Sequence, residues 1–149
     1  MFLFRASGAT YPRVVRLGKH AFPLSPAEVQ GDEFVLLSKN KEDCALTERQ
    51  IQYVAKVLAV RPAHSGELEG DFPLQDADTR WKYVVELYWT RALERPFSLN
   101  EVPGLTFKRY DTVQGFALLE PSDARAALAF LMDTNGRVLL DVVNNAARP

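Results

Sequence analysis

The stretch Arg80-Trp81-Lys82-Tyr83-Val84-Val85-Glu86-Leu87-Tyr88-Trp89-Thr90-Arg91 is the longest strand pattern in the chain. Aromatic and β-branched residues, which favour strands, dominate it. Alternate side chains of a strand point to opposite faces. One face would therefore carry Trp81, Tyr83, Val85, Leu87 and Trp89. Trp81 stands at the mouth of this strand, directly after a polar loop, whereas Trp89 lies within it and is expected in the core.

Further segments have the apolar or alternating patterns of strands, namely Phe2–Ala6, Phe34–Leu37, Gln50–Arg61 and Val113–Leu119. Gly115 in the last of these predicts a bend or bulge. Ala9–Gln30 contains several Pro and Gly residues, so we expect a loop with one or two turns of helix there. Pro62–Asp78 is long for a loop in a compact domain, which makes it a candidate binding loop.

Two helical signals follow the long strand. Ser98-Leu99-Asn100-Glu101 predicts a short helical turn with a capping box. Ser122 is expected to cap a helix over Asp123–Met132. Asn135-Gly136 then predicts a turn, and Arg137–Val143 is expected to form a final strand or an extended tail.

The order of these elements is strands, a long loop, further strands and a helix near the C-terminus. Strands and helices do not alternate regularly, which argues against a parallel α/β sheet. The sequence therefore predicts an α+β fold, with a mostly antiparallel β-barrel flanked by short helices. The 149 residues suit one domain. We assign it to residues 1–143, and residues 144–149 are expected to form a tail or the start of a linker.

The net charge of −1 hides an uneven distribution along the chain. Residues 1–27 contain no acid and four basic residues, which are Arg5, Arg13, Arg16 and Lys19. Residues 79–110 carry six basic and three acidic residues. Such segments can form a basic face for a polyanion, although the charges can equally intermix in three dimensions. The single cysteine, Cys44, and the lack of a signal-peptide pattern or a long apolar stretch favour a cytoplasmic protein.

Sequence motifs for catalysis, metal binding or cofactor binding are absent. The only histidines are His20 and His64, and Cys44 has no catalytic partner nearby in the sequence. Neither a Gly-x-Ser-x-Gly elbow nor a Walker-type loop occurs. A hard cation could be held by Asp71, Asp76 and Asp78, but such residues more often form a solvated loop. We therefore expect a binding domain without a cofactor, although catalytic groups that converge from distant positions would escape this search.

Aromatic and basic residues are the remaining candidates for function. The indole of Trp81 could stack on a planar ligand at the strand mouth, or it could cap the end of the barrel. Lys108 and Arg109 lie between two turns and have no acid close by until Asp111, which suits contact with phosphate. A solvated loop is the alternative for this pair.

Four blocks of sequence, in order, resemble the EVE and YTH branch of the PUA-like superfamily. They are Phe2–Arg5, Gly31–Ser38 with the following Gln52–Val57, Arg80–Leu87 with Glu94–Leu99, and Phe107–Gln114. The third block is similar to the "RW…V-x-V…PV-x-L" segment of EVE domains, and the fourth to the "SRDTQ" stretch of YTH domains. Together the blocks span nearly the whole chain.

The resemblance implies a PUA-like barrel that takes a modified base into an aromatic pocket. In YTH domains the base is N6-methyladenine, and in EVE domains modified cytosines are implicated. Trp81 matches a cage tryptophan of YTH domains. The block that approaches the nucleotide and its backbone is matched by Lys108, Arg109 and Asp111. Further contacts to the nucleic-acid backbone are expected from Arg5, Lys19 and His20.

The second cage tryptophan of YTH domains follows the first strand and has no match in this sequence. Tyr11, His20 or Phe22 would have to take its place. Another tryptophan, five positions before Trp81 in some YTH domains, corresponds to Asp76 here. Its carboxylate could accept a hydrogen bond from an exocyclic amine or could be an ordinary loop carboxylate. The EVE signature around the first helix is also missing. The expected base pocket comprises Trp81, Tyr11, Phe22, Asp76 and Asp111.

The resemblance thus favours a reader that flips methylated adenine or modified cytosine in DNA into an aromatic pocket. Such a domain would be the targeting module of a modification-dependent restriction system of the McrB type. It would be fused to or partnered with an AAA+ GTPase or ATPase or a nuclease. The alternatives are an RNA-binding PUA-like module, an enzyme acting on modified nucleosides, and a protein-interaction domain in which Trp81 is structural.

Overall fold

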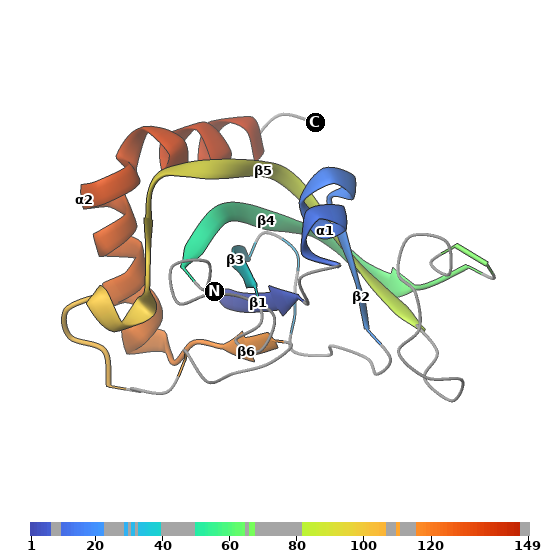
Figure 1. Cartoon of the computed structure of the whole chain (residues 1–149), viewed down its shortest axis with the longest axis horizontal. Helices are drawn as coiled ribbons and strands as arrows, with labels where there is room; N and C mark the ends of the chain where they lie inside the picture. The colour runs from blue at the N-terminus through green and yellow to red at the C-terminus, as the bar shows by residue number, and fades with distance from the viewer. Residues whose placement is uncertain are drawn as a thin grey trace.

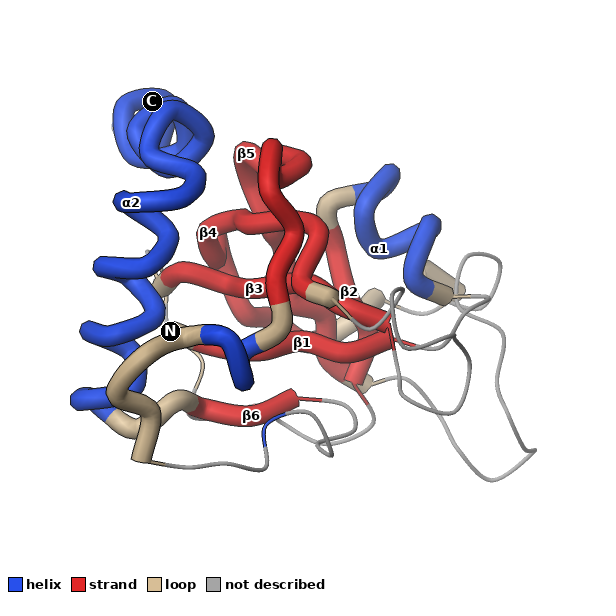
Figure 2. Tube along the Cα trace, turned by 60° about the vertical axis from the view of Figure 1, so that its left-hand side comes forward, coloured by secondary structure: helices blue, strands red, loops and turns tan. Residues whose placement is uncertain are grey.

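The computed structural model describes residues 1–6, 10–22, 29, 31, 33–39, 50–64, 66–67, 82–106, 110 and 116–146. Its elements in chain order are β1 (Phe2–Ala6), α1 (Tyr11–Leu17), β2 (Lys19–Phe22), β3 (Phe34–Lys39), β4 (Ile51–Pro62), β5 (Tyr83–Phe97), a 3-10 helix (Leu99–Glu101), β6 (Phe116–Leu118) and α2 (Pro121–Ala146). The strands form a curved layer (Figure 1). Figure 2 shows α2 on one side of this layer and α1 on the other.

The strands belong to one six-stranded sheet with the order β2-β5-β4-β3-β1-β6. β1 and β3 run parallel, with Phe2 opposite Val35. Every other neighbouring pair in this sheet is antiparallel. The predicted α+β class with a mostly antiparallel sheet is therefore confirmed. The strand β2 was missed because its four residues lie within a stretch where Pro and Gly predicted a loop.

The apolar run of β1 is buried on both of its faces, because the sheet has a hydrophobic cluster on each side. Phe2 and Phe4 belong to the cluster inside the curve of the sheet. Leu3 belongs to the cluster between the sheet and α2. The sheet curls strongly enough that the Phe4 ring in β1 contacts Phe22 in β2, with ring centroids 5.5 Å apart. These two strands are far apart in the strand order, so the curl gives the sheet a barrel-like shape.

The long strand β5 differs from its prediction at Trp89. Val54 pairs with Arg91 and Lys56 pairs with Tyr88, so β5 carries one residue more than β4 between these pairs. Such a bulge breaks the alternation of side chains. Trp89 has a φ of 54° and its side chain is exposed. The prediction that Trp89 is an ordinary core residue is therefore wrong.

The C-terminal helix is much longer than expected. α2 runs from Pro121 to Ala146 and contains one residue with non-helical backbone angles, Asn135. The predicted break at Asn135-Gly136 is therefore present as a kink between two helical segments (Figure 1), whereas the prediction of a strand or extended tail at Arg137–Val143 is wrong. Ser122 lies inside the helix and does not cap it. The first residues of the expected tail, 144–149, also belong to α2.

Other local predictions are confirmed. The Ser98 side chain accepts a hydrogen bond from the Asn100 N–H, and the Glu101 side chain accepts one of 2.6 Å from the Ser98 N–H. This is the expected capping box. The apolar stripe predicted for the helix also packs against the core, with Ala127 and Leu131 fully buried.

Candidate functional site

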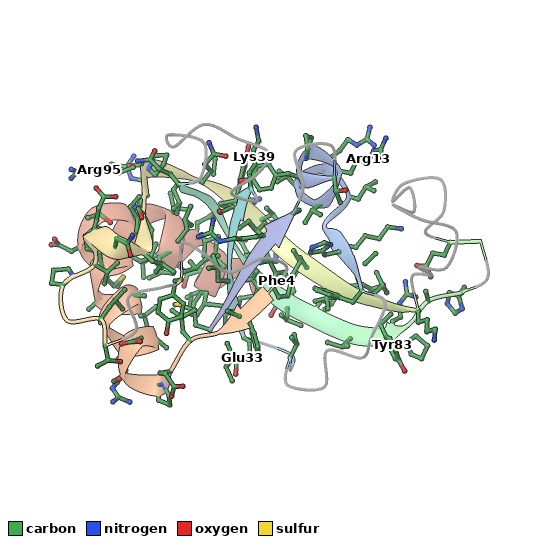
Figure 3. The ribbon with its side chains drawn as sticks, turned by 60° about the horizontal axis from the view of Figure 1, so that its bottom comes forward. Phe4, Arg13, Glu33, Lys39, Tyr83 and Arg95 are labelled. Carbon is green, nitrogen blue, oxygen red and sulfur yellow. The ribbon has the colours of Figure 1, made fainter. Side chains whose placement is uncertain are left out.

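A pocket of about 370 Å³ lies where α1 meets the end of β3 and the beginning of β4. Its lining residues are Tyr11, Pro12, Val15, Arg16, Lys39, Gln52 and Tyr53. The side chain of Lys39 lies on the same edge of the molecule as Arg13 of α1 (Figure 3). The pocket thus combines aromatic, amide and cationic groups from three elements.

The position of α1 over the sheet is set by the residue that follows it. Gly18 adopts a left-handed conformation with a φ of 65°, and its N–H donates to the carbonyl oxygen of Val14. Its own carbonyl oxygen accepts a hydrogen bond of 2.6 Å from the Leu87 N–H. A Cβ atom at this position would lie 3.1 Å from the Leu87 oxygen, so both the conformation and the close approach favour glycine. The chain then enters β2 directly, which fixes the helix beside the strands.

Tyr11 is the buried member of the pocket lining, with 4% of its surface exposed. Its hydroxyl donates a hydrogen bond of 3.0 Å to Oε1 of Gln52 and lies 3.4 Å from the carbonyl oxygen of Leu37. Its ring packs edge-on against Tyr53, with centroids 6.0 Å apart. Burial, and then the neighbouring Tyr53 phenol, raise the pKa of Tyr11. The hydroxyl therefore stays protonated at neutral pH and acts as a hydrogen-bond donor.

The described lining of the pocket includes two cationic side chains. Lys39 places its ammonium group 5.9 Å from the centroid of the Tyr11 ring. Arg16 is exposed at the rim. Among the residues that the structure describes, none of the lining side chains is acidic. A planar ligand that carries negative charge or acceptor oxygens matches these groups.

Arg5, predicted as a contact to the nucleic-acid backbone, is 4% exposed. Its guanidinium donates hydrogen bonds to Oγ of Ser38 at 2.8 Å, to the carbonyl oxygen of Lys39 at 3.2 Å and to that of Tyr110 at 3.1 Å. Arg5 therefore lies in the interior and fixes the backbone from which the Lys39 side chain extends. This geometry gives it a structural role next to the pocket.

Phe22 and His20, predicted near the base, both lie in the core of the curved sheet. Phe22 is 6% exposed and His20 is 8% exposed. Their rings pack against each other at 4.7 Å, and each also contacts Phe4. Burial lowers the pKa of His20 to about 4, an effect that a backbone hydrogen bond at Arg5 partly opposes. The structure does not place either ring in the lining of the pocket.

Lys19, another predicted contact to the nucleic-acid backbone, lies beside a charged cluster on the paired strands β4 and β5. It pairs with Glu86 in the register of β2 and β5. Arg61 binds Glu86 with a hydrogen bond of 2.9 Å and also binds Glu67. The hydrogen bonds from Arg61 and then from the His64 N–H lower the pKa of Glu67 to about 2, and the Lys19 charge acts in the same direction. These acids balance part of the local positive charge.

Five predicted site residues fall outside the described residues, namely Asp76, Trp81, Lys108, Arg109 and Asp111. Their contacts with nucleic acid remain predictions. Tyr83, the first residue of β5, pairs with Pro62, the last residue of β4, whereas Tyr53 lies near the beginning of β4. The described residues also contain no group of three or more His, Cys, Asp or Glu side chains that could hold a metal ion. No described helix is long and apolar enough to cross a membrane.

Tyr11, which the sequence analysis proposed for a base pocket, lines this pocket, but its role in binding a base stays a prediction. The sequence analysis did not propose four of its neighbours, which are Arg16, Lys39, Gln52 and Tyr53. A signal was present for two of them, because Lys39 ends the apolar run of β3 and Gln52 is a polar residue near the beginning of a strand with two largely apolar faces. Neither pattern shows that Lys39 and Gln52 lie near each other. The proximity of these residues depends on how α1 and β4 pack.

Comparison with known proteins gives matches in structure alone. No protein-family profile matches the chain, and no curated protein sequence matches it significantly. ASCH from Zymomonas mobilis has a similar structure, with a TM-score of 0.56 and 11% identity over 86% of this chain and 93% of that protein. A variant of the same protein with one tyrosine changed to phenylalanine also has a TM-score of 0.56, and a serine-to-alanine variant has 0.55. At this level of identity the likeness shows the fold.

The matched structures agree with the α+β fold expected from the sequence, and they do not single out an EVE or YTH domain. The element order and sheet of this chain agree with that fold class. The chain is thus an α+β domain whose fold is similar to that of ASCH from Zymomonas mobilis.

Proposed function

We propose that this chain is a nucleic-acid-binding module that receives one base in the pocket between α1 and β4. In this proposal, Tyr53 stacks on or lies against the base, and the cations Lys39 and Arg16 meet the neighbouring phosphates. The PUA-like fold is consistent with a nucleic-acid-binding module.

The composition of the pocket is the observation that carries this proposal. Within the described part of the chain, two tyrosine rings and two cationic side chains line the pocket, and no acidic side chain does. Aromatic rings bind bases by stacking, and cations bind the phosphate backbone. The volume of about 370 Å³ lies within the range of pockets that hold small ligands.

The finer parts of the proposal rest on the resemblance to EVE and YTH domains. They are that the base is modified, that DNA is preferred to RNA, and that the module serves a restriction system with an AAA+ GTPase or ATPase or a nuclease as its partner. Trp81 would supply the second aromatic surface. We further propose that the chain acts by binding alone, so incubation with a panel of nucleosides should yield no product.

Fluorescence anisotropy with labelled oligonucleotides at several salt concentrations tests the proposal. The set should include methylated DNA, unmodified DNA and RNA of the same sequence. Tyr53→Ala should weaken binding about tenfold, since loss of base stacking has an effect of that order. Lys39→Ala should weaken binding to all sequences and lower the salt slope by about one.

Arg137→Ala is the matched control, because Arg137 is an exposed cation on α2, on the other side of the sheet from α1 (Figure 2). It should bind like the wild type. The proposal fails if no oligonucleotide binds in a salt-dependent manner, or if Tyr53→Ala and Lys39→Ala both bind as well as Arg137→Ala.

A further inference from the structure

Arg5 and the ammonium group of Lys39 lie on opposite faces of the sheet. In the parallel pair of β1 and β3, Arg5 is opposite Ser38, so both of these side chains lie on one face. The next residue of β3 is Lys39, whose side chain points to the other face and reaches the ring of Tyr11. Arg5 is also buried. It therefore does not meet a ligand in the pocket, and it acts on the pocket through the backbone of Lys39.

The backbone of Lys39 is held by two hydrogen bonds to its carbonyl oxygen. Nη1 of Arg5 donates one of 3.2 Å, and the Ser38 hydroxyl donates another of 3.1 Å. The second hydrogen of Nη1 goes to Oγ of Ser38 at 2.8 Å. These three groups form a closed ring of hydrogen bonds at the end of β3, two residues beyond the point where Leu37 pairs with β4. The ring therefore fixes the backbone of Lys39 past the paired part of the strand.

The guanidinium of Arg5 is itself held from a third direction. Nη2 donates a hydrogen bond of 3.1 Å to the Tyr110 carbonyl oxygen. The Tyr110 hydroxyl donates one of 2.8 Å to Oδ2 of Asp123, at the beginning of α2. The planar fork of donors in arginine suits acceptors that lie in several directions, which a single ammonium group does not match. The position of Lys39 is thus tied to the packed interior of the domain.

Lys39 is restrained at both ends of its residue before a ligand arrives. Its backbone is held by Arg5 and Ser38, and its ammonium group lies 5.9 Å from the centroid of the Tyr11 ring. By contrast, Arg16, the other cation of the described lining, is exposed. A long side chain loses conformational freedom when it binds, and a side chain that is already restrained loses less. A phosphate contact made by Lys39 is therefore strengthened by its restraint.

We propose that Arg5 is a positioning residue for phosphate binding, which keeps the ammonium group of Lys39 at the pocket before the nucleic acid arrives. This inference rests on the proposed function and adds to it the means by which one contact is prepared. It assigns part of the affinity to a buried residue that does not touch the ligand. The contribution of Arg5 to affinity should depend on Lys39 and be absent without it.

The test is a double-variant cycle, in which fluorescence anisotropy measures binding of the oligonucleotide that the wild type binds most tightly. Arg5→Met should weaken binding about fivefold, since the immobilisation of a free lysine has a cost of that size. In the Lys39→Ala background the same change should leave binding unaltered. In the Arg16→Ala background it should still weaken binding about fivefold. Circular dichroism identifies a temperature at which each variant is folded.

Ser38→Ala is the second variant and decides the matter if Arg5→Met does not fold. It removes one hydrogen bond to the Lys39 carbonyl oxygen and leaves the guanidinium in place. It should weaken binding less than Arg5→Met does, and again only when Lys39 is present. Asn135→Ala is the control for a loss of stability, because Asn135 binds the backbone of Arg95 and does not line the pocket. It should bind like the wild type.

The outcomes distinguish this inference from the proposed function. Equal losses of affinity with and without Lys39 would show that Arg5 acts through the general stability of the fold, and would overturn the inference. Unchanged binding by Arg5→Met or, if that variant does not fold, by Ser38→Ala would overturn it as well. In both cases the proposed function stands if Tyr53→Ala still weakens binding. Failure of the wild type to bind any oligonucleotide rejects both.

Discussion

The guanidinium of Arg5 donates a hydrogen bond of 3.1 Å to the carbonyl oxygen of Tyr110, a residue 105 positions further along the chain. The same guanidinium also binds Ser38 and the backbone of Lys39. One side chain thus joins β1, the end of β3 and the segment that precedes β6. Because Lys39 lines the pocket, this junction also stabilises one of its walls.

Replacement of Arg5 by methionine should lower the free energy of unfolding by about 3 kcal/mol, since it removes charged hydrogen bonds and leaves buried carbonyl groups without a donor. The free energy of unfolding of Arg5→Lys should lie between those of the wild type and Arg5→Met, because lysine keeps the charge but lacks the several donors of the guanidinium group. Urea denaturation measures both. Arg137→Met, at an exposed position, should change the stability by less than about 0.5 kcal/mol. Equal stabilities of Arg5→Met and Arg137→Met would contradict the structural role of Arg5.

The stability of the domain should fall between pH 7 and pH 5 because of His20. Burial holds its folded-state pKa at about 4, below the ordinary value of 6.5. Between these two values the unfolded chain binds more protons than the folded one, so acid favours unfolding. The expected loss at pH 5 is about 2 kcal/mol.

Urea denaturation at both pH values, on the wild type and on His20→Leu, isolates this contribution. The loss of stability between pH 7 and pH 5 should be smaller by about 2 kcal/mol in His20→Leu. Leucine is chosen because His20 contacts the rings of Phe4 and Phe22 in an apolar cluster. The same pH dependence in both proteins would show that other groups are responsible.

Asp123, which is fully buried, links the beginning of α2 to the segment before β6. Its Oδ1 accepts hydrogen bonds from the N–H and the hydroxyl of Thr106 at 2.7 and 2.9 Å, and its Oδ2 accepts one of 2.8 Å from Tyr110. Asp123→Ala should cost about 3 kcal/mol and Tyr110→Phe about 1 kcal/mol. The double variant should lose less stability than the sum of the two single losses, because the second change removes a hydrogen bond that the first has already broken. Strict additivity in thermal or urea unfolding would exclude this coupling.

The side-chain amide of Asn135 makes two hydrogen bonds to the backbone of Arg95 in β5. Its Oδ1 accepts a hydrogen bond of 2.9 Å from the Arg95 N–H, and its Nδ2 donates one of 3.1 Å to the Arg95 carbonyl oxygen. Asn135→Ala should lower the free energy of unfolding by about 2 kcal/mol. Asn135→Asp keeps the first bond and should lose less. Asn144→Ala, at an exposed position of the same helix, serves as the control and should unfold like the wild type.

The contact between Asn135 and β5 also explains where sequence reasoning fell short on the fold. The Asn-Gly pair correctly indicated a break in the helix, which is a kink held by Arg95, a residue distant in sequence. The pair could not show that a second helical segment follows the break. Continuous apolar runs did predict β1 and β3, and alternating faces predicted β4 and β5. It could not show the bulge that exposes Trp89, because a single extra residue changes the register without changing the composition.

The candidate site was predictable to a smaller extent than the fold. Tyr11 was identified because an aromatic residue was needed in its segment. Lys39, Gln52 and Tyr53 reach it through the packing of α1 against β3 and β4, which no local pattern reports. Arg5 was interpreted from its charge alone, and its burial depends on acceptors from Ser38, Lys39 and Tyr110.

The place of β1 within the sheet has a consequence for how the protein is made. During synthesis β1 leaves the ribosome before either of its two partners, since Phe2 pairs with Val35 on one side and Leu118 on the other. Until β6 is synthesised, one edge of this strongly apolar strand has no partner. Unpaired apolar strands promote association between chains. The order of translation therefore leaves β1 open to association with other chains until β6 is synthesised, and we expect a chaperone that holds β1 to raise the yield of folded protein.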